Sequence, residues 1–116
     1  SGVLFENEIS KESIEYINNN NILNPNEKIV AYYDVTIMLN NTESAILTDK
    51  RVIYHKDKNN HSIPFEKIKN VEHKTEIFIG DIIVVESLSG DFLKIEIAPM
   101  NGGEVFLDLL NKKLHK

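Results

Sequence analysis

Residues 45–55 constrain the fold more than any other part of the chain. Two short β-prone runs, at 45–48 and 51–55, flank the polar pair Asp49-Lys50. Such runs favour extended strands, and a short polar pair between two of them is typical of a tight turn. The segment therefore predicts a β-hairpin, and with it a fold whose neighbouring strands are joined by short turns.

Five further segments are also predicted to be strands, and turn-forming residues bound them. Pro64 cannot donate a ladder hydrogen bond and marks a strand end or an edge. The spacing of three between Ile68 and Val71 indicates a β-bulge. No helical segment separates the strands, so the sheet is predicted to be antiparallel and the class α+β or barrel-like. The additional strands are predicted at residues 28–39, 61–63, 67–76, 82–88 and 92–97.

One helix is predicted before the strands and one after them. In residues 8–19, Ser10 is the expected N-cap, and Ile14 and Ile17 form an apolar stripe that should dock on the sheet. Near the C-terminus, Asn101 is the expected N-cap of a longer amphipathic helix, with Glu104 three residues later in a capping box. The apolar face of this second helix comprises Val105, Phe106, Leu109, Leu110 and Leu114.

Two phrases of the sequence carry a family resemblance. The chain resembles bacterial pleckstrin-homology-like (PH-like) and GRAM-like domains in two phrases that a polar turn separates. These are L-T-D-K-R-V-I-Y at 47–54 and S-I-P-F-E-K-I-K-N-V-E at 62–72. The resemblance implies an α+β, mainly β fold: a partly open barrel of two near-orthogonal antiparallel sheets of about seven strands. A C-terminal helix caps the barrel, and the short N-terminal helix is added to it.

The same resemblance implies a division of the chain and a role for the hairpin turn. Residues 1–26 are expected to be an N-terminal extension with the short helix, and residues 27–116 the PH-like domain, within a single domain overall. The turn motif Thr48, Asp49, Lys50 and Arg51 is expected to be structural. We expect the Arg51 guanidinium to bond a carboxylate or backbone carbonyls, a use for which its planar fork of donors is suited.

Length and charge restrict the function. A chain of 116 residues has room for one hydrophobic core, and its net charge of −5 argues against nucleic-acid binding, which needs clustered lysine and arginine. The chain has no cysteine, so disulfides and thiolate chemistry are excluded. No apolar run approaches the roughly 20 residues that span a bilayer. We expect a cytoplasmic protein without a cofactor.

Catalytic and metal-binding patterns are weak. His55 and His61 flank one predicted turn and could bind a metal with Asp57, but metal sites usually need three or four ligands at fixed spacing. Exposed or half-buried histidines of a hairpin are the favoured interpretation. The carboxylate pairs Glu72 with Glu76, and Glu86 with Asp91, lack any pocket signal. A non-catalytic domain is therefore predicted.

Lipid binding is the function most often attached to the PH fold. Domains that hold phosphoinositides usually carry lysine and arginine around the loop joining the first two strands. Here that loop, residues 40–43, has no basic residue and one acidic residue, Glu43. The nearest basic residues are Lys50, Arg51, Lys56 and Lys58, and phosphoinositide membrane binding is not expected. A membrane-surface or lipid-binding domain remains the alternative function.

A surplus of apolar residues favours a protein-interaction or self-assembly module. Contiguous exposed apolar surface on such a domain marks a partner site. A fully intramolecular core is the competing interpretation, since the N-terminal helix covers part of this surplus. We expect a protein partner or a second copy of the chain, bound through a strand edge or an apolar face anchored by Phe78. The candidate interaction surface comprises Tyr32, Met38, Ile77, Phe78 and Ile79.

Overall fold

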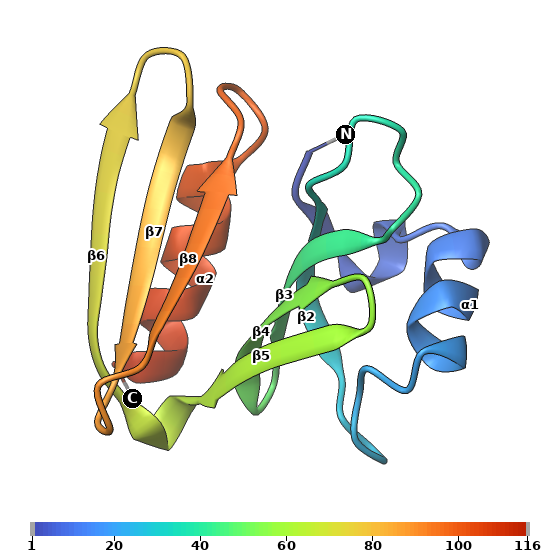
Figure 1. Cartoon of the computed structure of the whole chain (residues 1–116), viewed down its shortest axis with the longest axis horizontal. Coiled ribbons are helices and arrows are strands. Elements are labelled where there is room, and N and C mark those ends of the chain that lie inside the picture. Colours follow the sequence, from blue (N-terminus) through green and yellow to red (C-terminus); the bar gives the residue numbers. More distant parts are fainter. Residues whose placement is uncertain (1, 116) are drawn as a thin grey trace.

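The computed structural model describes residues 2–115 and consists of two antiparallel sheets and two α-helices (Figure 1). The two sheets are not closed into a full barrel. In spatial order, the five-stranded sheet comprises β1 (Leu4–Phe5), β2 (Ile29–Asp34), β3 (Glu43–Thr48), β4 (Arg51–Lys56) and β5 (Asn59–Pro64). The three-stranded sheet comprises β6 (Ile68–Glu76), β7 (Gly80–Ser87) and β8 (Phe92–Ile97). The helices are α1 (Lys11–Asn19) and α2 (Gly103–Leu114), and the 3-10 turns are η1 (Glu6–Glu8) and η2 (Phe65–Lys67).

The predicted hairpin is confirmed and forms the centre of the five-stranded sheet. Leu47 of β3 lies opposite Val52 of β4, on either side of the Asp49-Lys50 turn. The expected bulge at the start of β6 is also confirmed, because the register of β6 with β7 shifts between Ile68 and Asn70. These features follow from local residue preferences and from the alternation of apolar side chains.

The main core lies between the two sheets and α2. Its fully buried members include Leu47 of β3, Ile83 and Val85 of β7, and Phe106 and Leu110 of α2. Packing two apolar sheet faces and one helix stripe together removes all of these side chains from water, which is the largest favourable contribution to folding.

A second core lies on the other face of the five-stranded sheet, under α1. Ser10 is the N-cap, as predicted, and its side chain accepts a hydrogen bond from the Ser13 backbone N–H at 3.1 Å. Ile17 is 1% exposed and packs with Tyr32 and Ile46 of the sheet. The predicted docking of the N-terminal helix through Ile14 and Ile17 is therefore observed.

This docking gives a first expected result. Ile17→Ala should lower the free energy of unfolding by about 2 kcal/mol, near the low end for buried isoleucine, because a peripheral helix can partly collapse onto the cavity. Urea denaturation measures the change. Glu15→Ala, on the exposed face of the same helix, is the matched control and should change stability by less than about 0.5 kcal/mol. Equal stabilities of the two variants would show that α1 contributes no packing.

Two sequence predictions were wrong in detail, and one strand was missed. The strand predicted at 28–39 ends at Asp34, because the Asp34 carboxylate accepts hydrogen bonds from the Thr36 and Asn41 backbone N–H groups and folds the following residues into a loop. Strand β1 was not predicted, since its two residues gain their extended conformation by pairing with β2. Asn101 does not cap α2. Gly102 holds that position at φ +91°, and the Asn101 side chain instead donates to the Tyr33 hydroxyl at 3.2 Å.

Candidate functional site

Seven large apolar side chains are exposed on three loops at one end of the molecule, which is the upper end in Figure 1. The loops join β2 to β3, β6 to β7 and β8 to α2. Phe78 is 93% exposed, Ile37 98% and Met38 81%. We call this the three-loop end, and it comprises Ile37, Met38, Leu39, Ile77, Phe78, Ile79 and Met100.

The three-loop end carries no charged residue in its loops. Residues 35–42, 77–79 and 98–102 contain none, although charged residues make up 27% of the chain. Docking the loop tips against another surface would therefore desolvate no charged group of the loops themselves, and burial of charge is the costliest kind of polar burial. Depletion of charge at the centre of a patch is also what distinguishes interface cores from ordinary surface.

The β2–β3 loop is held in place by polar contacts at its base. The Asp34 Oδ1 atom accepts from the Thr36 backbone N–H at 2.9 Å, and Asp34 Oδ2 accepts from the Asn41 backbone N–H at 2.9 Å. The loop nevertheless presents Ile37 and Met38 to water. The polar base therefore fixes the position of an apolar tip that is exposed to water.

The predicted interaction surface is divided by the structure. Met38, Ile77, Phe78 and Ile79 lie at the three-loop end, as exposed side chains. Tyr32 does not: it is 1% exposed beneath α1, and its hydroxyl donates to Asn41 Oδ1 at 2.6 Å. This corrects its expected place on the surface, because the strand face that carries Tyr32 is covered by the N-terminal helix.

Sequence reasoning missed three members of the three-loop end. Ile37 and Leu39 were placed inside a strand because they continue its period-two pattern, and Met100 was not singled out. A signal was available in the Asn40-Asn41 pair, since asparagine tolerates positive φ. Leu39 and Asn41 have φ values of +53° and +67°, which no strand allows.

Arg51 of the turn motif is held in a buried ion pair with Glu27. The Arg51 Nε and Nη2 atoms donate to the two Glu27 carboxylate oxygens at 2.9 and 3.0 Å, and Nη2 also donates to the Ile22 carbonyl at 3.0 Å. The side chain of Glu27 is 1% exposed. Burial by itself would raise the pKa of Glu27, but hydrogen bonds from Arg51 and Thr48 outweigh it and leave this pKa below its ordinary value.

The other motif residues also make structural contacts. Thr48 Oγ1 accepts from the Lys50 and Arg51 backbone N–H groups and donates to Glu27 Oε2 at 2.6 Å. Asp49 Oδ1 accepts from the Lys28 backbone N–H at 3.0 Å. Among residues 2–115, the Lys50 side chain has no hydrogen-bond or ion-pair partner. Lys50 is therefore the motif side chain that is left available to a ligand.

The structure does not bring the candidate metal ligands together. His55 is buried, with Nε2 at 2.8 Å from the Tyr16 hydroxyl and Nδ1 at 2.6 Å from Asn60 Oδ1. His61 is exposed and lies opposite Tyr54 in the ladder. Within the described part of the chain, no group of three histidines or carboxylates could hold a metal ion. No helix in that part is long and apolar enough to cross a membrane.

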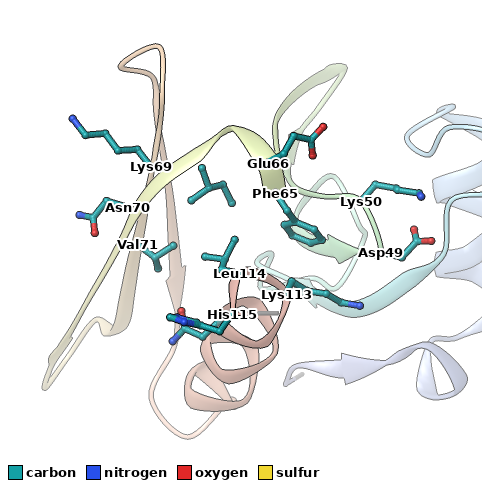
Figure 2. A pocket seen from close by; sticks show the side chains of 12 residues that line it. Asp49, Lys50, Phe65, Glu66, Lys69, Asn70, Val71, Lys113, Leu114 and His115 are labelled. Carbon is teal, nitrogen blue, oxygen red and sulfur yellow. The ribbon is translucent and has the colours of Figure 1, made fainter.

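A groove of about 750 Å³ opens at the opposite end from the three loops, between the start of β6 and the end of α2 (Figure 2). Phe65, Val71 and Leu114 point toward one another across it, and Lys69 and Lys50 extend away on opposite sides. We call it the β6–α2 groove. Its lining comprises Asp49, Lys50, Phe65, Glu66, Ile68, Lys69, Asn70, Val71, Asn111, Lys113, Leu114 and His115.

Two antiparallel sheets with a C-terminal helix packed against them define a PH-like protein. The chain belongs to the bacterial PH domain family, whose family model matches residues 23–112. Among solved structures, it is similar to a DUF1696 family protein with a pleckstrin-homology domain from Shewanella loihica PV-4. That similarity has a TM-score of 0.67 at 15% identity and covers 97% of this chain and 96% of the other. No curated protein matches the sequence.

Proposed function

We propose that this bacterial PH domain is a non-catalytic binding module that associates with proteins, a second copy of itself first of all, through the three-loop end. The single observation that carries the proposal is the absence of charge from three loops that expose seven large apolar side chains. PH-like domains are in general binding modules, and fold alone does not select the partner.

Self-association suits this surface because a two-fold axis lets one patch cover its own copy. Phe78 is the natural anchor, since buried aromatic residues dominate the binding energy of interfaces. A stable dimer should bury at least about 1,000 Å² in total. Residues on three loops can supply such an area, whereas the tip of one turn is too small.

Sedimentation equilibrium of the wild type beside Phe78→Asp tests the proposal. We expect the wild type to dimerise at high micromolar concentration and Phe78→Asp to weaken the dimer at least about tenfold, because a carboxylate would be desolvated at the centre of the interface. Phe78 is 93% exposed, so its replacement should leave the fold unchanged.

Phe92→Asp is the matched control. Phe92 is 60% exposed and lies opposite Glu86 on the outer face of the three-stranded sheet, away from the three loops. The Phe92→Asp substitution should leave the dimer unaffected. A wild type that stays monomeric at high micromolar concentration rules out self-association. A dimer that Phe92→Asp disrupts and Phe78→Asp does not would move the interface to the sheet face.

Insertion of the loop tips into a membrane surface is the second candidate, because protruding apolar tips without charge also suit the acyl boundary of a bilayer. The three loops lack the lysine and arginine that usually strengthen contact with anionic lipids. Co-sedimentation with phosphatidylcholine vesicles separates the two candidates. Binding that Phe78→Asp abolishes would favour the membrane, and no binding beside a concentration-dependent dimer would favour self-association.

A further inference from the structure

Strand β6 is a long sheet edge with free backbone groups. It has nine residues and lies at the end of the three-stranded sheet, so one of its sides faces no other strand. The backbone N–H of Leu88, directly after β7, donates to the Lys67 carbonyl at 2.8 Å. Every second residue before Leu88 along β7 therefore turns its backbone N–H and C=O groups toward β6. Alternation along an antiparallel ladder then directs the backbone groups of Val71, His73 and Thr75 away from β7.

This edge is weakly protected. Natural proteins guard exposed edges with proline, a bulge, charge or a covering element. In β6 the bulge is confined to Ile68–Asn70, and no proline follows it. The charged residues Glu72, Lys74 and Glu76 alternate with Val71, His73 and Thr75, so their side chains lie on the opposite face of the strand, and Lys74 is paired with Glu76 at 3.2 Å. The stretch from Val71 to Thr75 is therefore open to an added strand.

The β6–α2 groove begins where this open stretch starts. Its floor is formed by half-buried apolar side chains at the rim of the main core, among them Phe65, Val71 and Leu114 (Figure 2). A groove of this kind beside a strand edge can hold a side chain of the added strand, whose backbone supplies the affinity and whose side chains supply the specificity. A volume of about 750 Å³ accommodates a large apolar side chain with its neighbours.

The rim of the groove carries an excess of positive charge, in a protein of net charge −5. Lys50, Lys69 and Lys113 line it, together with His115. Asp49 and Glu66 also line it, which leaves an excess of one positive charge, and the Lys69 ammonium lies 3.9 Å from the Glu86 carboxylate. A partner segment that complements this rim therefore carries carboxylates on either side of an apolar residue.

We propose that the β6 edge and the β6–α2 groove together bind an extended peptide segment of a partner protein, which adds to the sheet as a strand. Its apolar side chain enters the groove, and acidic residues beside that side chain face Lys50, Lys69 and Lys113. The groove lies at the opposite end of the molecule from the three-loop end (Figure 1), and the β6 edge runs from the groove toward that end, with Thr75 two residues before Ile77.

The probe is a nine-residue peptide, Thr-Val-Thr-Val-Thr-Asp-Phe-Glu-Asp. A second peptide with the reversed sequence tests the opposite direction of the added strand relative to β6. It is titrated into the whole chain and followed through the backbone amide signals in NMR. We expect saturable shifts and slowed hydrogen exchange at the Val71, His73 and Thr75 amides. One control peptide has lysine in place of the acidic residues and loses the charge pairing. The other has N-methyl groups on alternate amides and loses the strand pairing. Each should bind at least about tenfold more weakly.

Charge reversal at the rim gives the matched variants. Lys113→Glu should weaken binding about tenfold, since a repulsion replaces an attraction, whereas Lys58→Glu in the β4–β5 turn makes the same charge change away from the groove and should have no effect. Both variants should leave self-association intact, and Phe78→Asp should leave peptide binding intact. Absence of saturable shifts at about 1 mM peptide, equal binding of the N-methylated peptide, or protection of the same amides by dimerisation alone would each overturn the proposal.

Discussion

Replacing Gly80 by alanine should destabilise the protein by about 3 kcal/mol or more. Gly80 begins β7 at φ +101°, and a Cβ atom there would lie 2.1 Å from the Ile97 carbonyl oxygen and 2.7 Å from Ala98 and Pro99 backbone atoms. Backbone cannot move aside as a flexible side chain can, so strain in the left-handed region adds to a direct clash. Thermal unfolding should show a fall in Tm of about 10 °C or more.

Gly90→Ala is the matched control for this prediction. Gly90 has a similar φ of +93°, but a Cβ atom there would meet no atom within 4 Å. It should therefore cost only the conformational strain of about 1 kcal/mol. Equal losses in the two variants would show that the close approach of β7 to the β8–α2 connection has no energetic consequence.

Arg51→Ala should lower the free energy of unfolding by about 3–5 kcal/mol, the usual cost of leaving a buried charge unpaired. The substitution removes both hydrogen bonds to the Glu27 carboxylate, whose side chain is 1% exposed. Arg51→Lys should also destabilise, since a single ammonium cannot reproduce the planar fork that holds Glu27, Ser62 and the Ile22 carbonyl. Urea denaturation of each variant measures these losses.

Lys50→Ala is the control for the ion pair, because Lys50 is the neighbouring exposed cation and should change stability by less than about 0.5 kcal/mol. The double variant Glu27→Leu with Arg51→Met should recover much of the loss, since a well-packed apolar pair avoids the desolvation of two charges. A wild-type Tm for Arg51→Ala would contradict the structural role of the turn motif.

Local sequence signals were sufficient for much of the fold. The run from Ala45 to His55 specifies its own hairpin, because the side-chain alternation and the polar turn act between near neighbours. The Ser10 cap and the bulge near Ile68 are likewise decided within a few residues. The role of Arg51 followed from its chemistry together with the family resemblance, although its partner Glu27 lies 24 residues away.

The sequence by itself determined the fold class and the antiparallel pairing of consecutive strands within each sheet after β1, because period-two patterning and turn residues act over short distances. The family followed from the resemblance of residues 47–54 and 62–72. Tertiary structure alone decided which apolar residues are buried. Tyr32 and Met38 lie on the same predicted strand, yet α1 covers Tyr32, and the Asp34 carboxylate turns Met38 out into a loop. The three-loop end and the β6–α2 groove are each assembled from segments far apart in sequence. Their composition depends on how the two sheets pack, which no local pattern specifies.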